Sequence, residues 1–254
     1  MLCFISGYLR STVVFTMWRL FVRLIIENTT CPLCQSEEVR EFSQDKRRTY
    51  LQCHVCKLVF VPPPQFLSRE DEKQRYDLHQ NSSLDAGYCR FLSRLFFPLN
   101  QCLAPGSCGL DFGSGPEPVL SRMFEEAGHS MTIFDYFYEP APAALEKQYD
   151  FITATEVVEH LRDPKKELER LWACLKQGGR LGIMTKLVDG QRGFSEWHYK
   201  NDLTHVCFFS RKTLIWLAAQ WNADLTFIDR DIVFLHKKPV FSSLPANTMQ
   251  DISA

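Results

Sequence analysis

The 254-residue sequence lacks a large net charge of either sign, because 29 basic residues nearly offset 30 acidic ones and leave a formal charge of −1. A protein without a strong positive field has no general attraction for polyanions, so broad nucleic-acid affinity is not expected. Internal repeats and low-complexity tracts are also absent, apart from one repeated CxxC motif. Because 45% of the residues are hydrophobic and 23% are charged, the composition is that of an ordinary globular protein.

A long uncharged apolar run is missing as well. Residues 1–26 are apolar and rich in aromatics, but Arg10, Arg19 and Arg23 interrupt them, whereas a membrane-spanning helix needs about 20 mostly uncharged residues. The segment also lacks the leading positive charge and the small-residue cleavage site of a signal peptide. Two interpretations of this leader stay open, an amphipathic surface helix from Met17 on and an upstream extension that is not native, and we favour the extension.

The remaining sequence divides into recognisable parts. Consecutive prolines at 62–64 cannot continue a helix or a sheet ladder, so they close a module that contains cysteine pairs. The last residues are polar and contain Pro and Ser, so a frayed tail is expected. The expected parts are the leader (1–26), a cysteine module (27–64), a helical connector (65–104), a larger domain (105–238) and the tail (239–254).

The larger domain alternates between strand-like and helical patterns, as α/β proteins do. Asp163 is expected to cap a helix with Pro164 at its first position, and Ser210 to cap another. This order predicts an α/β fold with a doubly wound, largely parallel sheet. Strands are expected at 107–112, 130–135, 149–155 and 180–186, and helices at 118–128, 163–179 and 211–221.

Four of the ten cysteines form two CxxC pairs, Cys31 with Cys34 and Cys53 with Cys56, separated by 18 residues. Each pair turns two thiolates toward one metal ion, so two pairs complete a tetrahedral site of the kind found in zinc ribbons. A module of about 38 residues cannot bury enough core to fold unaided, so bound zinc is expected. Paired thiols without a secretory signal indicate a reducing compartment, and we expect a cytoplasmic protein.

The sequence predicts the metal of this expected ribbon more clearly than the function of the ribbon. Lys46, Arg47 and Arg48 lie at the tip of the expected hairpin, where they could contact phosphates. However, residues 27–64 carry five acidic and five basic side chains, so the basic patch is small and offset. We therefore favour a structural or substrate-presenting ribbon over a nucleic-acid reader.

A glycine turn, "GLDFGSGPEPVL" at 109–120, joins an expected strand to an expected helix. A dinucleotide fingerprint needs a third glycine, where Pro118 stands here. Asp111 would repel a pyrophosphate but attract the ammonium and sulfonium groups of S-adenosylmethionine. Asp135, which is 20 residues past Gly115, follows the next strand and is expected to accept hydrogen bonds from the ribose of that cofactor.

At this point the sequence resembles the class I S-adenosylmethionine-dependent methyltransferases. "LDFGSG" (110–115) is similar to their first motif, "YDFITATEVVEHLRDP" (149–164) to the segment after their fourth strand, and "LKQGGRLGIMT" (175–185) to the turn into their fifth strand. The segment 197–214 resembles one in the subgroup akin to the ubiquinone-biosynthesis O-methyltransferases. The leading ribbon also resembles those that precede some members of this group.

The resemblance implies a Rossmann-like sheet, methyl transfer as the activity, and a set of cofactor contacts. Two departures stand out. Glu117 replaces the last loop glycine, and only 13 residues separate Asp135 from Tyr149, so the region of the third strand is shortened and the adenine contact is unassigned. The expected cofactor-binding residues are Asp111, Gly113, Ser114, Gly115, Asp135 and Thr155.

Candidate catalytic residues follow the fourth and fifth strands, because ligands of open α/β sheets bind beyond the carboxyl ends of the strands. Glu156, Asp202 and His205 are the expected catalytic residues, with His205 as a general base suited to neutral pH. Alternatives stay open: His205 as a core histidine, and Glu156 as a cap of backbone amides. Glu159 and His160 form a base or metal cluster with Glu156, although for His160 we favour a hydrogen bond within its turn.

Two further aromatic groups of the candidate site have competing interpretations. The connector contains Tyr76, His79, Asn81 and Tyr88, which form either part of a cofactor lid or ordinary surface. For the aromatics after the fifth strand, Trp197 and Tyr199, packing within the loop competes with a role in the site.

The acceptor is inferred chiefly from what is missing. The sequence has no Asn-Pro-Pro-Tyr signature of amino-directed nucleic-acid methyltransferases and no cysteine in an evident nucleophile motif. We therefore expect S-adenosylmethionine-dependent methyl transfer to oxygen of a small or carrier-bound molecule. Two alternatives stay open, an RNA methyltransferase that holds its substrate with the ribbon, and a non-catalytic binding protein that keeps the methyltransferase fold.

Overall fold

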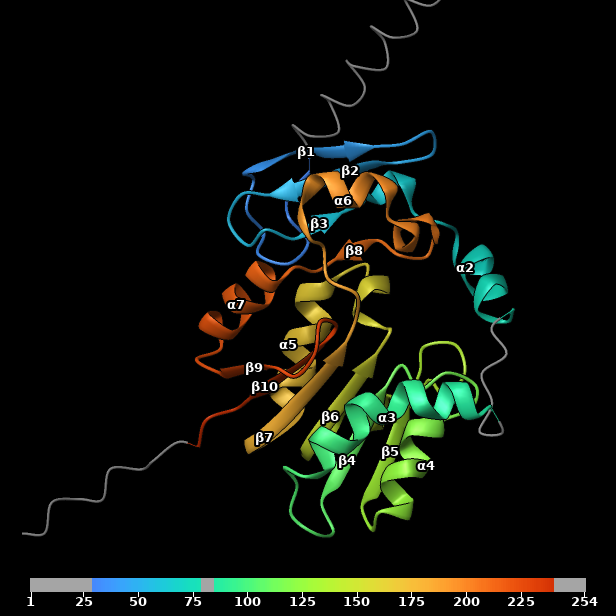
Figure 1. Ribbon diagram of the computed structural model, residues 1–254, viewed down its shortest axis with the longest axis vertical. Helices are drawn as coiled ribbons and strands as arrows, with labels where there is room; N and C mark the ends of the chain where they lie inside the picture. The colour runs from blue at the N-terminus through green and yellow to red at the C-terminus, as the bar shows by residue number, and fades with distance from the viewer. Residues whose placement is uncertain (1–28, 79–84, 240–254) are drawn as a thin grey trace, which may run out of the picture.

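The computed structural model describes residues 29–78 and 85–239 (Figure 1). The expected leader and residues 240–254 of the expected tail lie outside the described residues, as do His79 and Asn81 of the connector. No helix in the described part of the chain is long and apolar enough to cross a membrane.

The central sheet has six strands in the order β5-β4-β6-β7-β10-β9. The first four are parallel to one another, and β10 is antiparallel to both β7 and β9. This arrangement confirms the expected doubly wound, largely parallel sheet. The strands are β4 (Cys108–Phe112), β5 (Ser130–Phe134), β6 (Tyr149–Thr155), β7 (Leu175–Met184), β9 (Asp224–Phe227) and β10 (Ile232–His236).

The shortened region between Asp135 and Tyr149 contains no third parallel strand. The structure describes this stretch in full, and its one regular element is the 3-10 turn η2 (Pro142–Glu146). Strand β5 therefore forms one edge of the sheet, and β9 forms the other. The expectation of a truncated third-strand region is confirmed.

Helices cover both faces of the sheet, because alternate strand residues point to opposite sides. Phe151 packs in a core under α3 (Ala86–Asn100) and α4 (Val119–Glu126), whereas its neighbour Ile152 belongs to the core under α5 (Pro164–Cys174) and α7 (Arg211–Gln220). The second core continues into the cysteine module, where Leu51 and Leu58 are fully buried. The two parts of the chain therefore share one hydrophobic core.

The helix boundaries follow local signals, with one difference. Asp163 accepts a hydrogen bond from the Lys166 amide at 3.1 Å, and Ser210 forms a capping box with Thr213, so both expected caps are present. Helix α5, however, ends at Cys174 rather than at the glycines beyond it. Leu175 is already extended because it pairs with Tyr149 at the start of β7, and this long-range pairing overrides the local helical pattern.

The cysteine module is a small sheet to which the larger domain contributes a strand. A hairpin of β1 (Val39–Gln44) and β2 (Thr49–Cys53) is followed by β3 (Val59–Phe60), and β8 (Cys207–Phe208) pairs with β3. We call residues 29–61, with their three strands, the ribbon. The arrowheads of β6 and β7 point toward it, so it lies near the carboxyl ends of the parallel strands (Figure 1).

The remaining elements connect these parts. The turn η1 (Pro63–Gln65) leads into the connector, which contains α2 (Arg69–Tyr76) and α3. After β6 comes the turn η3 (Val158–His160), and after β7 come α6 (Gly190–Glu196) and the turn η4 (His198–Asn201). The elements after β6 and β7 place side chains over the end of the sheet that faces the ribbon.

Candidate active site

A cavity of about 930 Å³ lies at the carboxyl ends of the parallel strands. Its size is at the upper end of the range for small-molecule sites. Of the nine residues expected to bind cofactor or to act in catalysis, eight line it: Gly113, Ser114, Gly115, Asp135, Thr155, Glu156, Asp202 and His205. Tyr76 and Tyr88 of the connector line it too, as one interpretation of that segment predicted.

The glycine loop forms one wall of this cavity. Gly113 and Gly115 both have positive φ angles, +77° and +67°, which glycine adopts without steric cost. A Cβ on Gly113 would lie 2.3 Å from Val157, whereas a Cβ on Gly115 would meet no atom within 4 Å. The loop therefore needs glycine at 113 to close against the chain, and it leaves open space at 115 for a ligand.

Asp135 lies directly against this loop. Its carboxylate accepts hydrogen bonds from the amides of Gly115, at 3.1 Å, and of Phe137, at 2.8 Å. A carboxylate on the cavity wall beside a backbone loop is suited to accept hydrogen bonds from vicinal hydroxyl groups such as those of a ribose. Its contact with a cofactor stays a prediction.

Asp111 is the expected cofactor residue that the structure does not bring to the cavity wall. Its side chain lies beneath the loop, where Thr153 donates to one oxygen at 2.8 Å and Ser121 to the other at 3.1 Å. Burial raises the pKa of this carboxyl to about 6. The prediction of a direct contact with an ammonium group therefore needs correction, because both oxygens are held by the fold and any attraction must act through space.

Thr155 supplies a polar atom that fits a bound ligand. Thr155 lines the cavity, and its hydroxyl oxygen is buried with no hydrogen-bond partner within the protein. A buried polar group without a partner costs free energy, so a ligand that bonds to it is favoured. The unpartnered hydroxyl of Thr155 and the open space at Gly115 are both compatible with an additional polar molecule in the cavity.

The expected catalytic residues line the same cavity, and we call the part that Asp202 and His205 form the acceptor wall. The His205 ring is 7% exposed, and its Nδ1–H donates to the Tyr199 carbonyl at 2.8 Å, so Nε2 carries the lone pair. That nitrogen lies 3.9 Å from the Asp202 carboxylate. Burial lowers the pKa of His205 to about 4, so the ring is neutral at pH 7 but a weaker base than the sequence analysis expected. These distances bring together two residues that the sequence analysis selected.

Beside these residues, half-buried Glu156 and buried Glu159 accept hydrogen bonds from the same hydroxyl group. The Tyr199 hydroxyl donates to Glu159 and, at 3.2 Å, to Glu156, and Thr185 donates to Glu159 at 3.0 Å. Burial, reinforced by the charge of Glu156, raises the pKa of Glu159 to about 8, and burial also raises that of Glu156. Tyr199 is thus a residue of the site that the sequence analysis left undecided.

His160 contacts a more distant segment than expected. Its Nδ1 bonds to the Thr204 carbonyl at 3.2 Å, 44 residues away in the chain and not within its own turn. One ligand atom each of Glu159, His160 and His205 lies within 4.8 Å of the others. Both imidazoles hold a backbone carbonyl through Nδ1, which is the contact that orients metal-binding histidines. These three residues form a candidate divalent-cation site.

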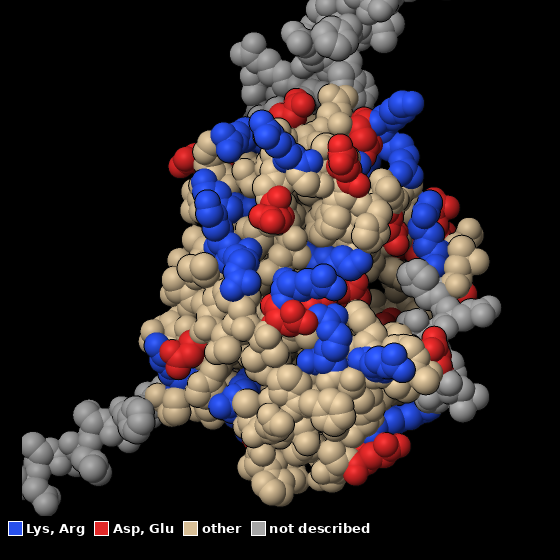
Figure 2. Space-filling model, viewed as in Figure 1, with Lys and Arg blue, Asp and Glu red and all other residues tan. Residues whose placement is uncertain are grey.

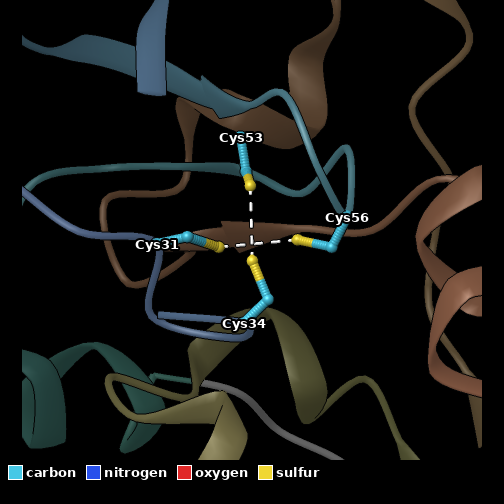
Figure 3. Close-up of side chains that lie close together, drawn as sticks. All are labelled: Cys31, Cys34, Cys53 and Cys56. Carbon is cyan, nitrogen blue, oxygen red and sulfur yellow. Dashed lines mark hydrogen bonds between the residues drawn. The ribbon is translucent and has the colours of Figure 1, made fainter. Parts of the chain in front are cut away.

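The four expected ligand cysteines lie together in the ribbon (Figure 3). The Sγ atoms of Cys31 and Cys56 are 3.5 Å apart, those of Cys34 and Cys53 are 3.4 Å apart, and none of the four forms a disulfide. In the view of Figure 3 the four sulfur atoms point toward a common centre. Tetrahedral zinc–thiolate bonds of about 2.3 Å need sulfur atoms at closely similar separations, so the cluster fits zinc.

Only two of the three basic residues expected at the hairpin tip lie on the surface. Lys46 and Arg47 are exposed, but Arg48 is 3% exposed, and its guanidinium donates to backbone carbonyls of the segment 200–205. Figure 2 shows basic and acidic side chains interspersed on the face in view. The suggestion that Arg48 contacts phosphates is therefore wrong, because this side chain is used inside the protein.

Comparison with known sequences gives one broad match. The sequence profile of a family described as a methyltransferase domain matches residues 79–227, which is more than half of the chain. Ubiquinone biosynthesis O-methyltransferases of Pseudomonas savastanoi pv. phaseolicola and Pseudomonas syringae pv. syringae are each 29% identical over 77 residues, or 30% of this chain. The chain spans about a third of the length of these curated relatives, since the match covers 33% of each.

Solved structures also resemble the chain. Burkholderia thailandensis 1,6-didemethyltoxoflavin-N1-methyltransferase, with bound S-adenosylhomocysteine, has a TM-score of 0.47 and 16% identity over 78% of this chain and 99% of that chain. Human N-acetylserotonin methyltransferase in complex with S-adenosylmethionine has a TM-score of 0.45 and 14% identity over 67% of this chain and 57% of that chain.

Proposed function

Because the chain belongs to the methyltransferase-domain family, we propose that it methylates a hydroxyl oxygen of a small or carrier-bound molecule with S-adenosylmethionine as donor. The observation that carries this proposal is the cavity, which is lined both by a glycine loop with its acidic partner and by a histidine with its acidic partner. When bound, S-adenosylmethionine supplies a methyl group on a sulfonium that an aligned nucleophile displaces.

On the cofactor wall, the chain would bind and orient the donor. The backbone at Gly115 leaves room for it, and the Asp135 carboxylate would accept hydrogen bonds from its hydroxyl groups. Asp111 lies behind this wall, and its carboxylate favours a cation in the cavity through space.

On the acceptor wall, the chain would take a proton. Nε2 of His205 carries a lone pair because Nδ1–H is held by the Tyr199 carbonyl. Asp202, at 3.9 Å, stabilises the imidazolium that forms when this nitrogen accepts a hydroxyl proton. A base on this wall favours oxygen as the acceptor atom, and so do the printed names of the two relatives at 29% identity, which are O-methyltransferases.

The cluster of Glu159, His160 and His205 supports a second route to the same reaction. A divalent cation held there would lower the pKa of an acceptor hydroxyl and so replace His205 as the means of removing its proton. Calorimetric titration of the protein with Mg²⁺ distinguishes the routes. The same titration with Ni²⁺, which imidazole ligands bind better, completes the test. Binding of either cation that His205→Gln abolishes supports the metal route, whereas absence of binding of both favours His205 as the base.

Methyl transfer from labelled cofactor into a cell extract, followed by separation into RNA, protein and small molecules, tests the acceptor class. We expect label in small or carrier-bound molecules. Label in RNA would favour the ribbon-binding alternative, which the burial of Arg48 weakens. If calorimetry finds no binding of S-adenosylmethionine or S-adenosylhomocysteine, the result supports the non-catalytic binding protein and overturns the proposal.

We also propose that the ribbon holds zinc and that the protein works in the cytoplasm. The four cysteines are unpaired by disulfides and lie at metal-binding separation, a combination that belongs to a reducing compartment.

A further inference from the structure

Arg48 connects the ribbon to the acceptor wall of the cavity. Its guanidinium donates to four backbone carbonyls of one short segment, those of Lys200, Asp202, Leu203 and His205, with distances of 2.9–3.1 Å for the last three. These contacts join residues more than 150 positions apart in the chain. The segment they hold carries Asp202 and His205, both of which line the cavity.

The chemistry of this contact explains why an arginine stands there. Apart from the short turn η4 at its start, the segment 199–206 belongs to no helix or strand, so these carbonyls have no ladder partners. Besides Arg48, only the Tyr50 hydroxyl reaches the Lys200 carbonyl and the His205 amide reaches that of Asp202, both at 3.3 Å, among the described residues. Buried carbonyls without donors are costly. Only the guanidinium fork offers five N–H donors in one plane, and it stays charged at any physiological pH. Arg48 therefore satisfies and fixes this segment.

Two further contacts fasten the same segment to the ribbon. Lys200, which is 5% exposed, forms an ion pair with Asp45 at 2.9 Å, and the Tyr50 hydroxyl donates to Asp45. At the other end, the amide of Val61 donates to the Val206 carbonyl at 2.9 Å, and Phe60 in β3 pairs with Cys207 in β8. The segment is thus held by the ribbon on both sides of His205.

The route from the cysteine cluster to the cavity is short and rigid. Cys53, one of the four clustered cysteines, ends strand β2, and Arg48 immediately precedes the first residue of that strand. The cofactor wall has different supports, since the amide of Gly113 bonds to Phe134 and that of Gly115 to Asp135. The ribbon therefore supports the acceptor wall, and the sheet supports the cofactor wall.

We propose that the four-cysteine ribbon is a structural part of the catalytic site, and that Arg48 is the positioning residue through which it holds His205 and Asp202. The structural half of this inference is independent of the reaction, whereas its catalytic consequence rests on the proposed function.

Amide hydrogen exchange of the full-length protein tests the structural half. In Arg48→Ala, exchange in peptides covering 199–208 should accelerate about tenfold or more, because several buried carbonyls lose their donor. Peptides covering the glycine loop, 110–117, should keep their wild-type rates. The matched control is Arg47→Ala, which removes an exposed arginine from the same hairpin and should leave both regions unchanged.

A milder variant tests the structural half of the inference if Arg48→Ala does not fold. Asp45→Asn removes the charge that faces buried Lys200, so it should accelerate exchange in 199–208 by a smaller factor. Wild-type protection of 199–208 in a folded Arg48→Ala protein, or equal acceleration at the glycine loop, overturns the inference. The second result would mean that Arg48 contributes only to global stability.

Kinetics with the acceptor fraction from the extract test the catalytic half. Arg48→Ala should lower kcat at least about tenfold and leave KM for S-adenosylmethionine near its wild-type value, because the cofactor wall is intact. Arg48→Lys should restore part of kcat, since it keeps one charged donor. An unchanged kcat in Arg48→Ala contradicts the positioning role. Failure of the wild-type protein to bind the cofactor would refute the proposed function and leave the exchange result to stand.

Discussion

The backbone amide of Gly115 lies 3.1 Å from the Asp135 carboxylate, so two residues expected to hold the cofactor contact each other directly. The contact joins the turn after β4 to the end of β5, and it exists because these strands are parallel neighbours whose carboxyl ends meet at one edge. The loop and its acidic partner are therefore preformed on the cavity wall.

The two loop glycines should respond differently to alanine. Gly115→Ala places its Cβ in the cavity, so it should cost only the strain of a positive φ, about 1 kcal/mol in the free energy of unfolding, and weaken S-adenosylhomocysteine binding tenfold or more. Gly113→Ala, the matched variant, should destabilise by about 3 kcal/mol, because its Cβ meets Val157 at 2.3 Å. Urea unfolding and calorimetry measure both. Wild-type affinity in Gly115→Ala would place the cofactor elsewhere.

Asp111 should make the protein less stable as the pH rises. Burial raises its pKa from 3.8 to about 6, so between these values the unfolded chain loses the proton more readily than the folded one. Stability is therefore lost across pH 4 to 6, by about 3 kcal/mol for this group. Asp111→Asn should match the wild type at pH 4 and exceed it at pH 7. Identical pH profiles in urea unfolding would contradict the raised pKa.

Removal of the Tyr199 hydroxyl should destabilise the glutamate pair. In Tyr199→Phe, Glu156 and Glu159 lose a shared donor, which should cost about 1–3 kcal/mol in the free energy of unfolding at pH 7 and raise the pKa of Glu159 above its value of about 8. The control is Tyr138→Phe, whose hydroxyl donates to an exposed Asp77 at 2.7 Å and should matter little. Equal losses of stability in the two variants would show that the buried Tyr199 hydroxyl contributes no more to stability than the exposed Tyr138 hydroxyl.

The ribbon should bind about one zinc ion per chain. Cys31→Ser combined with Cys53→Ser removes two of four ligands and should abolish zinc, whereas Cys102→Ser, at an exposed cysteine outside the cluster, should retain it. Zinc loss should also increase hydrogen exchange in β2 and β3, because the metal replaces a core that a small ribbon lacks. Elemental analysis in reducing buffer that finds no zinc in the wild type refutes the assignment.

Much of the fold and part of the site could be predicted because their signals are local. A CxxC pair brings two thiols together wherever it occurs, and a glycine turn between a strand and a helix has its shape within a few residues. The alternation of strand and helix patterns likewise predicts a parallel sheet, and the carboxyl ends of its strands then locate Thr155, Glu156 and His205 near one cavity.

Other features depend on contacts between distant segments. The sequence alone predicted the cysteine cluster, the doubly wound sheet and the loop with Asp135, since CxxC spacing, strand–helix alternation and a glycine turn are all visible in the sequence. Only the tertiary structure decided that Arg48 is buried, that Asp111 lies behind the cavity wall and that Tyr199 bridges two glutamates. The physical reason is that burial and hydrogen-bond partners are set by which segments pack together, and Arg48 meets its carbonyl acceptors about 150 residues away along the chain.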